Sequence, residues 1–103
     1  MSDDVKNDKL NIELSEEMAE GQYSNLAVIS HSSSEFVFDF IKIMPGMPKG
    51  KVKSRVMMTP QHAKRLLRAL NDNIVKYESQ LGKITEGEQP NFPMNFGGPA
   101  GEA

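Results

Sequence analysis

The pattern of apolar and polar positions is most regular between Thr59 and Gly82, where it has the spacing of an amphipathic helix. Thr59 suits the N-cap, Pro60 suits the first helical position, and Gly82 suits the left-handed stop. At 3.6 residues per turn, the apolar residues fall within an arc of roughly 100°. They are Ala63, Leu66, Leu67, Leu70, Ile74, Tyr77 and Leu81. The sequence therefore predicts one long helix with a single buried face.

Two segments rich in β-branched and aromatic residues come before this helix, Gln22 to Ser32 and Glu35 to Met44. Ser33 and Ser34 lie between them and suit the two-residue turn of a β-hairpin. With that turn, one face carries Phe36, Phe38 and Phe40 together with His31, Ile29, Ala27 and Tyr23. We expect this aromatic face to lie beneath the helix. One extra loop residue would shift the pairing and change which residues share a face.

A third strand is predicted from Lys51 to Met58, after a loop rich in proline and glycine. Strict alternation would place Lys51, Lys53, Arg55 and Met57 on one side and Val52, Ser54, Val56 and Met58 on the other. Leu10 to Leu14 also alternates, which predicts a short additional strand, and Ser15 and Gly21 suit the ends of one helical turn. The predicted fold is α+β: an antiparallel sheet of three main strands plus the short N-terminal strand, packed on one long C-terminal helix in β-β-β-α order.

Three regions differ in composition. Residues 1–9 form an acidic arm, residues 10–82 form the single α+β domain, and residues 83–103 form a tail rich in Gly, Pro and Glu. Both ends hold too few apolar residues to offset the entropy of ordering, so we expect them to be disordered. The PNFPMNF segment of the tail is alternatively a short docking motif.

The composition excludes several classes of protein. The 103 residues include no cysteine, which excludes disulfides and thiolate metal sites and fits a reducing compartment. No apolar run approaches the roughly 20 residues of a membrane span, and Met1 is not followed by a signal sequence. We therefore expect a cytoplasmic protein without membrane contact.

The net charge of −2 conceals an uneven distribution of charge. Residues 1–20 are mainly acidic, whereas residues 40–71 contain basic residues and no acid. The candidate basic surface consists of Lys49, Lys51, Lys53, Arg55, Lys64, Arg65 and Arg68. It either binds an anionic partner such as nucleic acid or is screened by the acidic arm within the protein or its oligomer. The pI of about 5.6 favours screening, and we expect no useful affinity for nucleic acid at physiological salt.

Candidate catalytic chemistry centres on a polar cluster of His31, Glu35 and Asp39. A Ser/His/Asp arrangement is disfavoured, because Ser30 and Ser32 point away from His31 in a strand. His31 and His62 lack the spacing of metal ligands. Asp39 lies among apolar residues, and a salt bridge to Lys53 or Arg55 is favoured over a general-base role. The sequence therefore assigns no catalytic, metal or cofactor-binding residue.

The segment from Ala19 to Gly82 resembles a family of small bacterial proteins known only as domain of unknown function 3467. The resemblance rests on Tyr23, Asn25, the pair Ser30 and His31, Glu35, Phe36, Asp39, Phe40 and the helix start Thr59-Pro60. It implies a bacterial cytoplasmic protein. It transfers no activity and no catalytic residue.

The favoured function is a non-enzymatic binding or assembly module that works as a homo-oligomer, most simply a dimer with a twofold axis. Both faces of the predicted sheet are apolar, and a helix of this length would extend beyond the strands. A protein partner is compatible with the same surfaces. The alternatives are a nucleic-acid-binding protein that uses residues 49–68, and a small enzyme or metal protein centred on His31 and Asp39.

Overall fold

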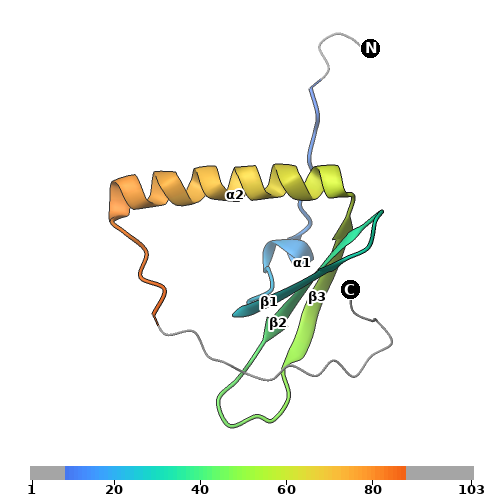
Figure 1. Cartoon of the computed structure of the whole chain (residues 1–103), viewed down its shortest axis with the longest axis vertical. Coiled ribbons are helices and arrows are strands. Elements are labelled where there is room, and N and C mark those ends of the chain that lie inside the picture. Colours follow the sequence, from blue (N-terminus) through green and yellow to red (C-terminus); the bar gives the residue numbers. More distant parts are fainter. Residues whose placement is uncertain (1–8, 88–103) are drawn as a thin grey trace.

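The computed structural model describes residues 9–87 (Figure 1). An antiparallel sheet of three strands in the order β1-β2-β3 is followed by a long helix, which confirms the predicted α+β fold. The elements are α1 (Glu16–Ala19), β1 (Leu26–His31), β2 (Phe36–Lys42), β3 (Lys51–Met58) and α2 (Pro60–Leu81). The PNFPMNF segment and most of the two ends predicted to be disordered lie outside the described residues.

The β1–β2 hairpin has the predicted two-residue turn at Ser33 and Ser34. The backbone N–H of Ser32 donates to the carbonyl of Glu35 at 2.9 Å, and this bond closes the turn. The register pairs Ile29 with Phe38, and the neighbouring residues pair one to one along both strands without interruption. One sheet face, called the aromatic face, therefore carries Ala27, Ile29, His31, Phe36, Phe38, Phe40, Ser54, Val56 and Met58.

The hairpin is shorter than predicted because a side chain takes over the pairing at its open end. The Asn25 amide donates from Nδ2 to the Ile43 carbonyl at 2.9 Å, and its Oδ1 accepts from the Ile43 N–H at 2.8 Å. A side-chain amide thus replaces a backbone peptide group at this position. As a result, β1 begins at Leu26 instead of the predicted Gln22.

A β-bulge in β3 changes the predicted facing of two residues, Lys51 and Val52. Phe40 pairs with Ser54, but the next residue, Ile41, pairs with Val52, so Lys53 is the extra residue on β3. The prediction that Val52 shares a face with Ser54, Val56 and Met58 is therefore wrong. The face opposite the aromatic face, called the second face, carries Leu26, Val28, Ser30, Val37, Asp39, Ile41, Val52, Arg55 and Met57.

Local signals at both ends define α2. The Thr59 hydroxyl accepts a hydrogen bond from the backbone N–H of His62 at 3.3 Å, and Pro60 occupies the first turn. Gly82 has a φ of 100°, which side chains rarely adopt, and its N–H donates to the Glu78 carbonyl. Both predicted boundaries of the helix are confirmed.

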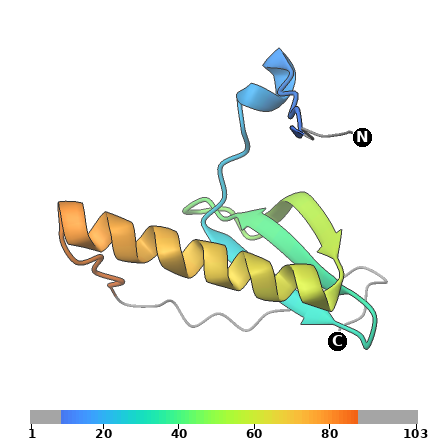
Figure 2. The same ribbon diagram turned by 90° about the horizontal axis from the view of Figure 1, so that it is seen from above.

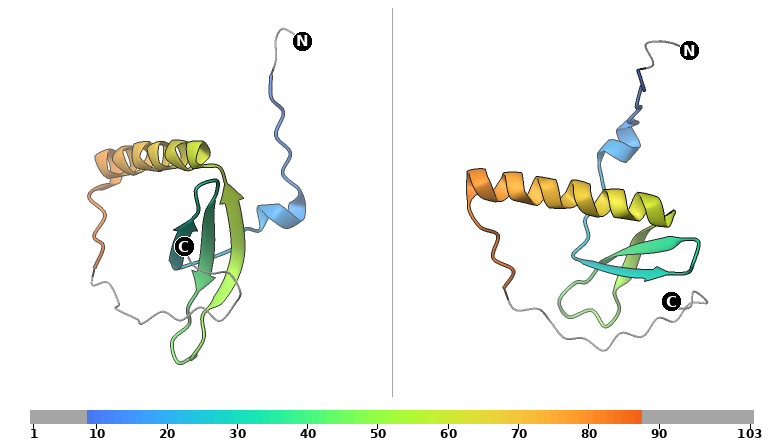
Figure 3. Two further views of the ribbon diagram at one scale, coloured as in Figure 1. Left: turned by 45° about the vertical axis from the view of Figure 1, so that its right-hand side comes forward. Right: turned by 45° about the horizontal axis from the view of Figure 1, so that its top comes forward.

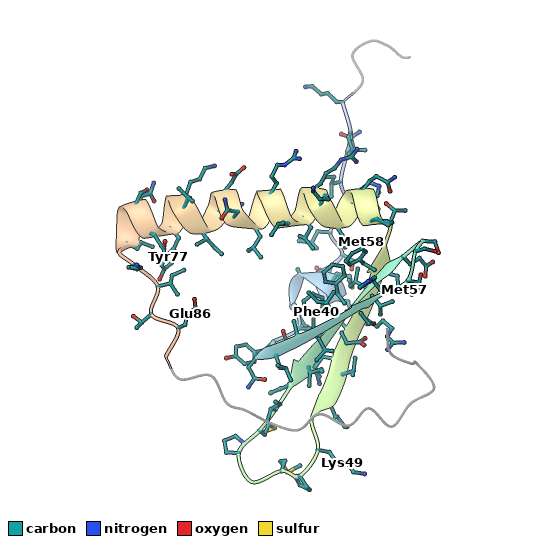
Figure 4. All side chains as sticks on the ribbon, in the orientation of Figure 1. Phe40, Lys49, Met57, Met58, Tyr77 and Glu86 are labelled. Carbon is teal, nitrogen blue, oxygen red and sulfur yellow. The ribbon has the colours of Figure 1, made fainter. Side chains whose placement is uncertain are left out.

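The first half of α2 lies above the aromatic face, and the second half extends beyond the sheet (Figure 2). Phe40 and Met58 lie between the sheet and this first half (Figure 4). Within the described residues, only Phe38, Asp39 and Ile41 are buried, and all three belong to β2. The core therefore lies in the central strand, and α2 contributes no buried residue.

The structure does not show the additional N-terminal strand that was predicted from Leu10 to Leu14. This segment forms no strand pairing, and the side chains of Leu10 and Ile12 are more than four-fifths exposed. Alternation alone does not make a strand, because the backbone also needs a partner. The helical turn that follows is confirmed as α1, capped by the Ser15 hydroxyl, and it lies on the opposite side of the sheet from α2 (Figure 3).

Candidate interaction surface

One apolar feature of the described surface is the row of large α2 side chains that the sequence predicted to be buried, called the α2 stripe. Ile74 is 37% exposed, Leu70 is 55% exposed and Leu81 is 70% exposed. The α2 stripe comprises Leu66, Leu67, Leu70, Ile74, Tyr77 and Leu81. Tyr77 lies on the underside of the overhanging end of α2 (Figure 4), and the spacing of three or four residues places the other stripe residues on the same side of the helix.

The opposite side of α2 is charged and exposed, so the helix is strongly two-sided. Its charged residues are Lys64, Arg65, Arg68, Asp72 and Lys76. A helix of this kind derives most of its stability from covering its apolar side, since packing of an amphipathic face contributes more to helices in proteins than intrinsic helix propensity does. Completing the burial of each large stripe residue would contribute roughly 1 kcal/mol, about half the value for full burial.

The sheet also exposes apolar side chains on both faces. On the aromatic face, Ile29 is 55% exposed and Val56 is 40% exposed. On the second face, Val52 is 48% exposed and Met57 is 54% exposed. Exposed apolar side chains of the described residues therefore occur on both faces of the sheet as well as on α2.

Asp39 and Arg55 form the one polar site in the centre of the second face. Arg55 Nε donates to Asp39 Oδ1 at 2.6 Å, and Arg55 Nη2 donates to Oδ2 at 2.8 Å. The Asp39 residue is 2% exposed, whereas the Arg55 side chain is 42% exposed. The two hydrogen bonds from Arg55 lower the pKa of Asp39 from its ordinary value of 3.8, against the opposing effect of burial. The predicted salt bridge is confirmed, and its partner is Arg55, since Lys53 occupies the bulge.

The structure does not bring the predicted polar cluster together. His31 lies on the aromatic face, where its ring stacks on Phe36 with centroids 5.2 Å apart, whereas Asp39 lies on the second face. Glu35 follows the hairpin turn and is exposed. The shared site that a small enzyme would need from these residues is therefore not formed.

The candidate basic surface falls into two separate groups. Lys49, Lys51 and Lys53 lie in the β2–β3 loop and at the start of β3, and Figure 4 shows Lys49 at the far end from α2. Lys64, Arg65 and Arg68 lie on α2, beyond the other end of β3. Five residues separate Lys53 from the end of β3, which is roughly 17 Å at about 3.3 Å per residue. Arg55, between them, is engaged by Asp39.

Pairing adds a further cation to the first group that sequence reasoning missed. Lys42 at the end of β2 lies directly opposite Lys51 of β3. Like charges at directly opposed positions destabilise a sheet. The register needed to find this pair depends on the bulge, which the sequence pattern did not reveal.

A metal centre and a membrane-spanning helix are two further kinds of functional feature. Within residues 9–87, no three His, Cys, Asp or Glu side chains come close enough together to hold a metal ion. Among the helices of these residues, none has the length and apolar character needed to cross a membrane.

Sequence comparison now places the chain in a family. The family described as "Protein of unknown function (DUF3467)" matches residues 1–86, and the chain belongs to it. The match includes the whole segment from Ala19 to Gly82 that carries the resemblance and extends it mainly toward the N-terminus. No curated protein and no solved structure matches the chain.

Proposed function

We propose that this chain is a non-enzymatic binding or assembly module that works as a homodimer, with the α2 stripe as the centre of the interface. The observation that carries the proposal is a two-sided helix whose large apolar side chains, from Leu66 to Leu81, are 37–70% exposed. Exposed apolar patches of this kind mark interaction surfaces. A second copy supplies matching surfaces, because each copy offers both an overhanging helix and an incompletely covered sheet.

The non-enzymatic part of the proposal rests on how the polar groups are used. Asp39 is the buried titratable residue of the described core, and both of its carboxylate oxygens accept hydrogen bonds from Arg55. A carboxylate held in this way, with a lowered pKa, is a poor general base. Its role is to hold β2 and β3 together across the second face.

We do not extend the proposal to nucleic acid. The two basic groups lie at opposite ends of β3, and the arginine between them is paired with Asp39. A gel-shift titration with DNA and RNA at about 150 mM salt should show no micromolar binding. Tight binding that is lost when Lys51 and Lys53 are replaced by Glu would make nucleic acid the leading candidate partner.

Sedimentation equilibrium at micromolar concentration tests the dimer. The wild-type chain should have the mass of two copies, and a Leu70→Glu/Ile74→Glu variant should have the mass of one, because the interface would have to bury two carboxylates. The matched control is Gln61→Glu/Ser79→Glu, which adds the same charge on the opposite side of α2 and should remain dimeric. A monomeric wild-type chain would refute the proposed function.

A further inference from the structure

The outer edge of β3 is free of strand partners within residues 9–87, because the sheet ends there. Hydrogen bonding in an antiparallel sheet alternates, and the bond from Ser32 to Glu35 fixes its phase. On β3, the N–H groups of Ser54, Val56 and Met58 therefore point toward β2. The N–H groups of Arg55 and Met57 point outward, where the carbonyl groups of an added strand would accept hydrogen bonds from them.

The segment from Leu10 to Leu14 has the pattern of such a strand but pairs with nothing in the described structure. Its apolar side chains, Leu10, Ile12 and Leu14, are 83%, 84% and 70% exposed. Asn11 and Glu13 alternate with them. As an edge strand beside β3, this segment would form backbone hydrogen bonds, and the apolar side chains of β3 would cover its own apolar side chains.

Charge indicates which edge accepts the segment. The start of β3 carries Lys51 and Lys53, with Lys42 opposite Lys51 and Lys49 in the loop before it. The segment and α1 with its C-cap carry acids instead: Glu13, Glu16, Glu17 and Glu20. The free edge of β1 has no lysine or arginine, so it lacks this complementarity. The lysines would also repel a second β3, which favours an acidic strand over pairing of two identical edges.

We propose that Leu10 to Leu14 of one copy adds as a fourth strand to the outer edge of β3 in a second copy. This inference rests on the proposed dimer and specifies a second contact within it. In each chain, Leu10 to Leu14 and the outer edge of β3 both lack a strand partner within the described residues. In a dimer with a twofold axis, the segment of each copy would pair with the β3 edge of the other. The added strand would bring Glu13 toward the lysines of β3 and extend each sheet to four strands.

Amide hydrogen exchange, followed by NMR on the full chain, tests the added strand. In the dimer, the outward amides of Arg55 and Met57 should exchange at least about tenfold more slowly than the outward amides of Ala27 and Ile29 at the β1 edge. The test variant is Asn11→Pro/Ile12→Pro. Neighbouring residues in a strand direct their N–H groups to opposite sides, so one proline removes a ladder bond in either register. The control is Asn11→Val/Ile12→Val, which keeps strand-forming residues.

The proline variant should lose the protection of Arg55 and Met57, and the valine control should keep it. Equal, fast exchange at both sheet edges of a dimeric wild-type chain would overturn the inference and leave the proposed dimer intact. A monomeric wild-type chain would overturn both, and sedimentation of the same samples distinguishes these results.

A mixing experiment tests whether the strand comes from the second copy. Isotope-labelled wild-type chain is combined with an excess of the unlabelled proline variant, so that most labelled copies have a partner without a competent segment. Protection of Arg55 and Met57 in the labelled copy should then be lost. Retained protection would show that each chain pairs with its own segment, which would overturn the exchange between copies.

Discussion

The central strand β2 and the helix α2 differ in how far their side chains are buried. In β2, Phe38 is 7% exposed, Ile41 is 6% exposed, and Asp39 has both carboxylate oxygens bonded. In α2, the local signals for a helix are all present, but none of the residues is buried. One chain therefore completes the packing of the central strand but covers its longest element only in part.

The difference shows that regular secondary structure and a packed core have separate causes. A cap, a favourable first residue and a terminal glycine define where α2 begins and ends, and they operate within a few residues. Burial of the α2 stripe needs a surface as long as the helix, roughly 33 Å for 22 residues. The three-stranded sheet does not extend under the second half of α2 (Figure 1).

Removing a ring from the centre of the sheet should have the largest effect on stability. Phe38→Ala leaves a cavity in the core, and we expect it to lower the free energy of unfolding by about 3–5 kcal/mol. Tyr23→Ala removes a ring that is 71% exposed and should have a much smaller effect. Urea unfolding followed by circular dichroism measures both. Equal losses would contradict the assignment of the core to β2.

Replacing the buried carboxylate should change how stability depends on pH. Because the folded-state pKa of Asp39 lies below 3.8, its contribution is present above that value and is lost as pH falls through the folded pKa. Asp39→Asn should be less stable than wild type at neutral pH, and the difference should shrink below about pH 4. Urea midpoints across this range give the comparison. Parallel curves would contradict a stabilising Asp39–Arg55 pair.

A methyl group added at Gly50 should disturb the buried side chain next to it. A Cβ there would lie 3.0 Å from Ile41 Cγ2 and 3.3 Å from Ile43 Cγ1. We expect Gly50→Ala to cost about 1–2 kcal/mol through crowding. Lys49→Ala, at the exposed neighbouring position, is the control for thermal unfolding. A Gly50→Ala variant as stable as this control would show that the Ile41 side chain is loosely packed.

Loss of the N-cap should have the smallest effect of the set. Thr59→Ala removes the acceptor for the His62 N–H, which typically costs about 1 kcal/mol. Thr59→Ser keeps a hydroxyl and should retain most of the stability. Urea unfolding followed by helical circular dichroism would show the difference. Equal losses in the two variants would mean that the hydroxyl does not stabilise α2.

Features that depend on nearby residues could be predicted from the sequence. These include the ends of α2 and the turn at Ser33 and Ser34, whereas the salt bridge of Asp39 was predicted only as a choice between Lys53 and Arg55 of the next strand. Features that depend on strand pairing could not. The bulge at Lys53 changes the face of Val52, and no local pattern marks it, because Lys51 to Met58 alternates without interruption in the sequence.

The same limit applies to the candidate interaction surface. The spacing of the α2 stripe showed which residues form the apolar side of the helix, but not whether the sheet beneath is large enough to cover them. Leu10 to Leu14 shows the same limit for strand pairing. Its alternation predicts a strand, and the described part of the single chain supplies no strand partner for it. Both observations have one physical cause, namely that burial and pairing depend on surfaces distant in sequence.

The most direct test of the account is an isotope-filtered NMR experiment on a mixture of labelled and unlabelled wild-type chains. It detects contacts between protons of different copies. The methyl groups of Leu70, Ile74 and Leu81 in the labelled copy should show contacts to protons of the unlabelled copy. If these methyl groups show no such contacts at concentrations where the chain is fully assembled, the α2 stripe is not the interface and the central claim is wrong.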